Sequence, residues 1–217
     1  SPPKKVQNVN PPNLRDIKSV LVNTSLIKLD ISIFSSHLIL MANFVAIPIT
    51  LRDSMQLPTI SHWQVYLTAI FTSLFIMVPF IMFGERLKKE NLFLILSILL
   101  IMLSQIGLAL FGLSLNFIII FLILFFGAFN YLEALLPSKV SKTAQKNTKG
   151  TALGVYSTSQ FIGIFIGGLV GGFFYQQFGP ISVHLFCLFI TFLWLLLMLF
   201  FSKNENLGKN ELEEEAV

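Results

Sequence analysis

Charge and cysteine are both scarce in this sequence. Only 12% of the 217 residues are charged, where about 25% is typical of soluble domains. The single cysteine, Cys187, excludes a disulfide within the chain and a metal site built on several thiolates. No basic patch interleaved with aromatic residues suggests nucleic acid as a partner. Hydrophobic residues make up 54% of the chain, so most of its surface is expected to meet lipid.

Enzyme signatures are missing as well. The sequence contains no Gly-x-Ser-x-Gly elbow, no His-Glu-x-x-His zinc motif and no phosphate-binding loop that ends in Gly-Lys-Ser or Gly-Lys-Thr. Ser36 and His37 are mere neighbours in one segment and do not define a catalytic pair. We therefore expect no catalytic residue, no metal and no cofactor, and predict that the protein is not an enzyme.

Six apolar runs fill the chain between Leu29 and Ser202. Each has the length of about 20 residues that a helix needs to cross a hydrocarbon core of roughly 30 Å. The predicted fold class is all-α, a polytopic membrane bundle of six transmembrane helices. The spans are expected at residues 29–51, 63–84, 92–113, 117–137, 150–174 and 181–202.

The segments that flank this 29–202 transmembrane domain are polar. Residues 1–28 are expected to form a proline-rich linker followed by a short helix on the membrane surface over 14–27. Residues 203–217 form an acidic tail. Every lysine and arginine except Arg52 falls on one side of the predicted spans. The positive-inside bias places that side, and with it both termini, in the cytoplasm.

Two features indicate a repeat and a missing partner. Pro48 stands at the end of the first span and Pro137 at the end of the fourth, and the three-span groups that these spans open run in opposite directions. This is the pattern of the 3+3 inverted repeats of secondary transporters, although proline near a span end is common in any case. Ser1 stands where an initiator methionine is usual, so we expect half of a longer protein that lacks an N-terminal six-helix half.

Polar residues are unevenly shared among the spans. The third and sixth are nearly all Leu, Ile, Phe and Met, whereas the first, fourth and fifth carry amides, a histidine and a carboxylate. Polar groups are tolerated at depth where they face protein or a watery cavity, so these three helices are expected to border a cavity that the third and sixth shield. The candidate substrate-cavity residues are Gln160, Tyr156, His37, Asn43 and Asn130.

Several roles remain open for these candidates. Gln160 lies near mid-depth and shares a helix face with Tyr156, which suits either solute binding or a hydrogen bond between helices. His37 is more often a packing residue, although its near-neutral titration leaves proton coupling open. The small residues Gly154, Gly163, Gly167 and Gly171 recur at near four-residue steps, which is typical of close helix packing.

Glu133 is the one acidic residue well inside the predicted spans. Counted from the outer end, it lies about 24 Å along a crossing of roughly 30 Å, in the cytoplasmic third. A carboxylate at that depth is expected to be protonated or paired, with Lys139 and Lys142 near in sequence. A gating salt bridge is favoured over a proton-transfer site.

Three segments resemble the major facilitator superfamily. Residues 131–138 and 149–157 are similar to the tenth-to-eleventh-helix region of its drug:proton antiporter branch, especially the YajR-type group, and residues 43–48 with His37 are similar to the seventh helix. The resemblance covers about residues 14–200 and implies the C-terminal half, whose seventh, eighth, tenth and eleventh helices border the central cavity. The loop 84–89 lacks the Asp and second Gly of the family's Gly-x-x-x-Asp-x-x-Gly-Arg-Lys motif.

The expected function is therefore half of a secondary active transporter in a bacterial inner membrane. It would move a small molecule by alternating access in proton-coupled efflux, with the N-terminal half, the substrate, a proton and membrane lipid as partners. The alternative is a six-span structural or assembly subunit without transport activity. An intramembrane hydrolase is a distant third interpretation, because no nucleophile and base are placed together.

Overall fold

The computed structural model describes residues 14–214, with side chains for residues 14–202, and every regular element in that range is helical. The elements are α1 Leu14–Val22, α2 Thr24–Asp53, a 3₁₀ turn Thr59–Ser61, α3 His62–Arg86, α4 Glu90–Phe111, α5 Leu115–Thr143, α6 Lys149–Phe178 and α7 Pro180–Glu214. Within the described residues, six helices, α2 to α7, are long and apolar enough to cross a membrane. The predicted all-α bundle of six spans is confirmed. The expected linker, residues 1–13, lies outside the described residues.

Several helices extend beyond the apolar runs that predicted them. Helix α2 begins at Thr24 because the side-chain Oδ1 of Asn23 accepts hydrogen bonds from the backbone N–H groups of Ser25 and Leu26, at 3.0 and 3.2 Å. Helix α5 continues to residue 143, and the backbone of α7 continues to residue 214 through a segment that contains the helix formers Lys, Leu and Glu.

The two prolines at the expected span ends lie inside helices. Pro48 belongs to α2, which continues to residue 53, and Pro137 belongs to α5. Membrane helices tolerate proline because neighbouring groups satisfy the freed backbone. Helices α6 and α7 are joined by Gly179 alone, whose φ of 81° suits a residue without a Cβ.

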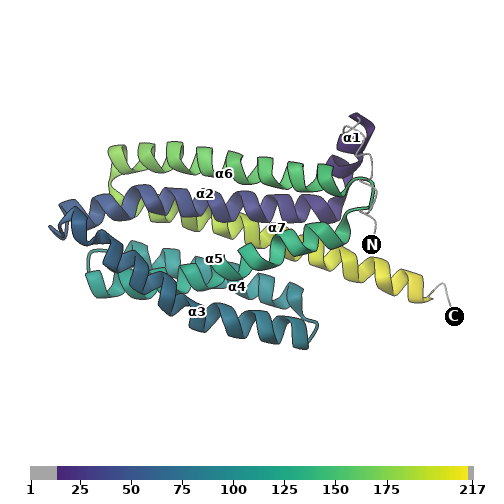
Figure 1. Cartoon of the computed structure of the whole chain (residues 1–217), viewed down its shortest axis with the longest axis horizontal. Helices are drawn as coiled ribbons and strands as arrows, with labels where there is room; N and C mark the ends of the chain where they lie inside the picture. Colours follow the sequence, from purple (N-terminus) through teal and green to yellow (C-terminus); the bar gives the residue numbers. More distant parts are fainter. Residues whose placement is uncertain (1–13, 215–217) are drawn as a thin grey trace, which may run out of the picture.

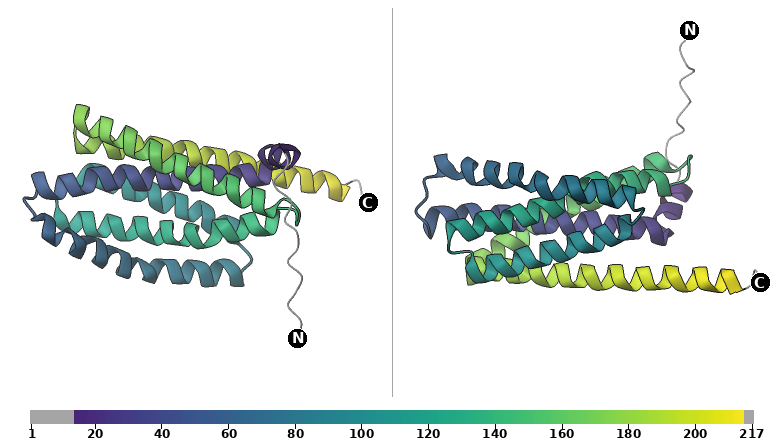
Figure 2. Two further views of the ribbon diagram at one scale, coloured as in Figure 1. Left: turned by 45° about the horizontal axis from the view of Figure 1, so that its top comes forward. Right: turned by 90° about the horizontal axis from the view of Figure 1, so that it is seen from below.

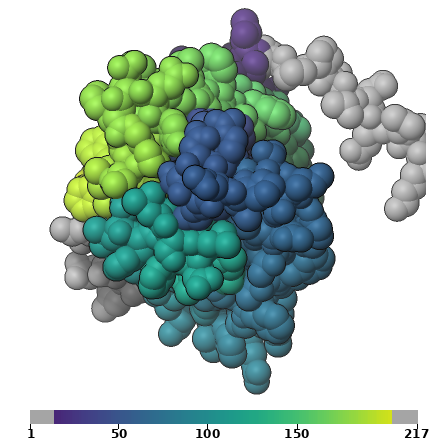
Figure 3. Space-filling view, turned by 90° about the vertical axis from the view of Figure 1, so that its left-hand side faces the viewer, coloured from purple at the N-terminus to yellow at the C-terminus, as the bar shows by residue number. Residues whose placement is uncertain are grey.

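The long helices run side by side along the bundle (Figure 1), and α1 lies at the end where α2, α4 and α6 begin. We refer to this as the α1 end. The helical C-terminal part of α7 projects from the same end in both views of Figure 2. Figure 3 looks at the opposite end, where the tip of α2 lies between the end of α6 and the connection from α4 to α5.

Helix packing follows a twofold pattern. If α2, α3 and α4 are matched with α5, α6 and α7, the α2–α6 contact corresponds to the α5–α3 contact, and α2–α7 corresponds to α5–α4. All four contacts are extensive, and α2–α6 is the most extensive of all. Under the same matching, the α4–α7 pair becomes α7–α4 and the α2–α5 pair becomes α5–α2, so each of these contacts is unchanged. The contacts therefore follow the pairing that a 3+3 inverted repeat requires.

Candidate functional site

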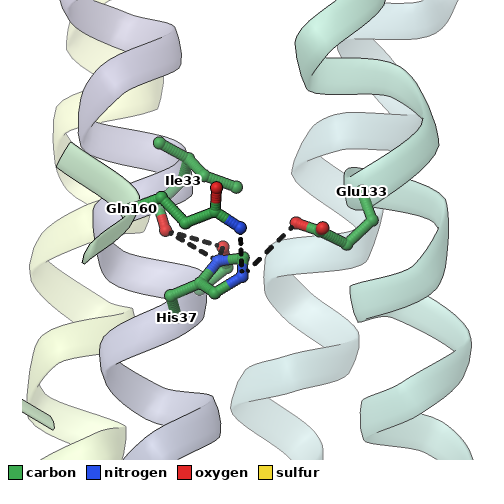
Figure 4. Close-up of polar contacts among 5 residues, drawn as sticks. Ile33, His37, Glu133 and Gln160 are labelled. Atoms are coloured by element: carbon green, nitrogen blue, oxygen red, sulfur yellow. Dashed lines mark hydrogen bonds and ion pairs between the residues drawn. The ribbon is translucent and has the colours of Figure 1, made fainter. Parts of the chain in front are cut away.

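Three polar side chains from three helices meet inside the bundle: His37 of α2, Gln160 of α6 and Glu133 of α5 (Figure 4). The Nε2 atom of His37 lies 2.8 Å from Nε2 of Gln160 and 3.8 Å from Oε1 of Glu133. The three residues are 13, 11 and 10 residues from the helix termini at the α1 end. At 1.5 Å per residue they all lie about 15–20 Å from that end, at a similar level of the bundle.

The contacts of His37 define its hydrogen-bonding state. Its Nδ1 atom lies 3.2 Å from the backbone oxygen of Ile33 and 3.4 Å from Oγ of Ser36. Because a carbonyl oxygen only accepts, Nδ1 carries the hydrogen, and Nε2 of the neutral ring is then an acceptor. The side-chain N–H of Gln160 donates to it. The ring is 5% exposed and packs against Phe129 with centroids 5.2 Å apart, which holds it in this orientation.

Glu133 faces His37 without bonding to it. Its Oε1 atom is buried and has no hydrogen-bond partner among the described residues, and 3.8 Å exceeds hydrogen-bond length. Protonation of His37 at Nε2 would place a positive charge beside this oxygen. It would also remove the lone pair that accepts from the Gln160 N–H, so the Gln160 amide must turn its oxygen toward Nε2 to stay bonded, whereas Oε1 of Glu133 can accept without turning.

Lys139, one of the two lysines expected as a partner of Glu133, is engaged elsewhere. The Nζ atom of Lys139 donates to Oδ1 of Asn91 at 2.6 Å and lies 3.4 Å from Oε2 of Glu90. Residues 133 and 139 are six apart, so their side chains point about 120° apart around α5. Glu133 lies at the level of His37, since its Oε1 atom is 3.8 Å from Nε2 of that residue.

The other candidate cavity residues occupy separate environments. Asn130 Nδ2 donates to Ser73 Oγ of α3 at 3.2 Å, which makes it a tie between helices. Asn43 is 2% exposed, and neither atom of its amide group has a hydrogen-bond partner among the described residues. It lines a small pocket with Tyr66. Tyr156 is 6% exposed and lies one turn before Gln160.

Glycines bring α6 close enough to α2 for the histidine contact. A Cβ atom at Gly163, Gly167 or Gly171 would overlap the backbone of α2, whereas one at Gly154 would meet no heavy atom within 4 Å. The first three lie on the face of α6 that carries Gln160. Gly154 therefore has no part in this contact. The close approach of the two backbones is what places the Gln160 amide 2.8 Å from His37.

A polar contact that was not predicted from the sequence joins α4 and α7, the helices that were expected to shield the cavity. Nδ1 of His184 in α7 lies 3.4 Å from Oε1 of Gln105 in α4, and both residues are buried. Trp194 of α7 also donates to Ser32 of α2 at 3.2 Å. The sequence contained a signal for this contact, because Gln105 and His184 are both polar residues within apolar runs. These polar groups hold α7 against its neighbours.

The family comparison agrees with this architecture. Residues 29–216 match the model of the Major Facilitator Superfamily. The chain belongs to this family of transporters and is an integral membrane protein. The resemblance seen in the sequence is confirmed at the level of the superfamily, and membership in it points away from an enzyme.

Three curated relatives carry the comparison further. The chain is similar to the inner membrane transport protein YajR of Escherichia coli (strain K12), with 39% identity over 178 residues that cover 81% of this chain and 38% of the relative. An uncharacterized transporter of Buchnera aphidicola subsp. Baizongia pistaciae (strain Bp) is 32% identical, covering 81% and 45%. Another from subsp. Acyrthosiphon pisum (strain APS) is 34% identical, covering 74% and 41%. The chain spans less than half the length of these relatives.

Proposed function

We propose that the chain is the C-terminal half of a proton-coupled exporter of small, amphiphilic molecules that works by alternating access. Membership in the superfamily supports transport, and coverage of 38–45% of the relatives supports a half. The uneven burial of the spans supports a partner that covers some of them. In the most apolar stretch of α2, 61% is buried inside the structure, against 17% for α3 and for α6. By the resemblance, these two exposed spans are the eighth and eleventh helices, which border the central cavity.

The proposed orientation places the α1 end in the cytoplasm of a bacterial cell, in its inner membrane. The connections at that end, 87–89 and 144–148, carry Lys88, Lys89 and Lys146, whereas Arg52 lies at the opposite end. Cytoplasmic loops of membrane proteins carry such an excess of basic residues.

The position of His37 beside both Gln160 and Glu133 is the observation that supports proton coupling. With His37 neutral, the acceptor Nε2 ties α2 to α6 through Gln160. With His37 protonated, the same atom becomes a donor and favours Glu133 of α5. A proton thereby changes which pair of helices is held together, and this difference in contacts is what can bias two conformations.

A flux measurement tests the proposal. The natural full-length protein is reconstituted into liposomes with a pH gradient and an enclosed pH-sensitive dye, and ethidium is added as an amphiphilic cation. We expect ethidium movement to be accompanied by proton movement, and His37→Gln to abolish the proton movement. His184→Gln is the matched control, because it removes a buried histidine outside the cluster. Equal proton flux in His37→Gln and the unmodified protein would contradict the proposal.

A further inference from the structure

Asn43 of α2 and Tyr66 of α3 bury polar atoms outside the histidine cluster, on its side away from the α1 end. Asn43 is 2% exposed, and neither Oδ1 nor Nδ2 has a hydrogen-bond partner among the described residues. The hydroxyl oxygen of Tyr66 is buried and is also without a partner in the described part of the chain. Buried polar groups in proteins are nearly always bonded, so these three atoms are candidates for contacts with a ligand.

Both residues line one pocket between α2, α3 and α5. Its volume is about 10 Å³, which is room for about one water-sized group. None of the eight lining residues is Asp, Glu, Lys, Arg or His. A charge without a counter-charge is costly in such surroundings, so the group that fits is small and uncharged. The six apolar lining residues are Leu40, Phe44, Ile47, Leu122, Phe125 and Phe126.

The hydrogen-bonding groups of the two polar residues narrow the choice further. The amide of Asn43 offers two N–H donors and one acceptor oxygen, and the hydroxyl of Tyr66 can donate or accept. A ligand hydroxyl has the size of a water molecule and both donates and accepts, so it can bond to both residues. A carboxylate or an ammonium group is charged, and an amide carries two polar heavy atoms where the volume admits one.

Aromatic rings lie beside these polar groups. Phe44 is 38% exposed and stacks on the ring of Tyr66, with centroids 5.4 Å apart and planes 25° from parallel. The ring of Phe126 lies 6.3 Å from that of Phe44. The exposed part of Phe44 offers an apolar body, and an aromatic ring in particular, a surface to pack against.

The pocket adjoins the histidine cluster through a layer of rings. Phe125 of the lining stacks on Phe129, with centroids 5.7 Å apart, and Phe129 packs against His37 at 5.2 Å. Asn43 is six residues after His37 on α2, which places it about 9 Å farther from the α1 end. A molecule in the pocket would therefore contact the ring layer that holds the histidine.

We propose that Asn43 and Tyr66 form a subsite of the transport cavity for an uncharged hydroxyl group, carried by an aromatic or other apolar molecule whose body lies against Phe44. An N–H of Asn43 donates to the hydroxyl oxygen, and the hydroxyl donates to the oxygen of Tyr66. The assignment rests on the proposed function, because α2, α3 and α5 are three of the helices expected to border the transport cavity.

Binding of 2-naphthol to the natural full-length protein in detergent tests this subsite. The matched ligand is 2-methylnaphthalene, in which a methyl group of similar size replaces the hydroxyl. Both are measured by equilibrium dialysis and naphthalene fluorescence, with protein-free micelles subtracted. The measured quantity is the ratio of the two affinities, so partitioning into detergent cancels between variants. One neutral hydrogen bond is worth about a fivefold change in affinity. We therefore expect Asn43→Leu to lower the preference for 2-naphthol about fivefold.

Tyr66→Phe should lower the preference by a similar factor, and it keeps the ring that stacks on Phe44, so it decides the question if Asn43→Leu does not fold. Gln105→Leu is the matched control. It also replaces a buried amide whose Nε2 atom has no partner among the described residues, but Gln105 does not line the pocket, so the ratio should stay unchanged.

An unchanged ratio in both Asn43→Leu and Tyr66→Phe would overturn the proposal, because the pocket would then not distinguish a hydroxyl from a methyl group. An equal fall in Gln105→Leu, or no binding of 2-naphthol to the unmodified protein, would overturn it as well. The measurement uses no proton gradient. The subsite can therefore fail while proton-coupled movement of ethidium stands, and that movement can fail while the subsite stands.

Discussion

Replacement of Gly167 by alanine tests the packing that positions the site. A Cβ atom built at Gly167 would overlap the backbone oxygen of Leu38 and lie 2.8 Å from its Cα and 2.9 Å from its carbonyl carbon. These are backbone atoms of a buried helix, so no side chain can move aside. Helices α2 and α6 must separate or shift for the methyl group to fit.

The expected cost follows from the size of this overlap. Insertion of a methyl group into a tightly packed interface costs about 1–3 kcal/mol. The shift is about 2–4 °C per kcal/mol for 150–250 residues and becomes smaller for longer proteins, so the unfolding midpoint of the full-length protein should fall by up to about 12 °C. The same separation lengthens the 2.8 Å contact between Gln160 and His37, which lies two turns away on the same helix face. Proton-coupled transport should therefore fall together with stability.

The assay is thermal unfolding of the natural full-length protein in detergent, followed by tryptophan fluorescence. Gly154→Ala is the matched control, since it makes the same chemical change on α6 where no heavy atom lies within 4 Å. It should leave the midpoint unchanged or slightly higher, because alanine favours helix. If Gly167→Ala unfolds at the same temperature as Gly154→Ala, the close α2–α6 contact does not stabilise the protein and the reasoning fails.

Three further changes test neighbouring parts of the account. Glu133→Gln should reduce transport sharply between about pH 6 and 8 with substrate binding largely retained. Normal flux of the variant across that range would mean that Glu133 is a packed, neutral acid whose charge has no role in transport. Ser32→Ala should destabilise the protein by about 1–3 kcal/mol in thermal unfolding because it leaves the buried Trp194 N–H without an acceptor; an unchanged midpoint argues against that bond. A double-mutant cycle of Asn130→Ala and Ser73→Ala should give a coupling of about 0.6 kcal/mol, and strict additivity would mean that the α3–α5 hydrogen bond contributes nothing.

The fold could be predicted from the sequence because membrane spans follow from length and apolarity alone. The six runs became α2 to α7, with errors at the ends where Asn23 begins a helix early and where α5 passes through Pro137. Periodicity on one helix also placed Gln160 and Gly167 on a common face. These are properties of single helices, which a local pattern can contain.

Contacts between helices could not be read in the same way. The approach of Glu133 to His37 depends on how α5 lies against α2, and proximity in sequence pointed to Lys139, which bonds to α4 residues. Gly154 follows the same small-residue spacing as Gly167 and yet has open space beside it. The sequence shows which residues share a face of a helix, but the packing determines what that face meets.

Thiol labelling tests the central claim, an aqueous transport cavity bordered by α2, α5 and α6, most directly. Single cysteines are placed at Gln160 and, as a control, at Phe192, which is 49% exposed on α7 and ten residues from Ser202, at a similar depth. The background is the natural full-length protein in native membranes with the buried Cys187 replaced by serine. The account predicts that a membrane-impermeant thiol reagent modifies the cysteine at 160 and leaves the one at 192, in contact with lipid, unmodified. Equal labelling of both positions, or protection of 160 from both sides of the membrane, would contradict it.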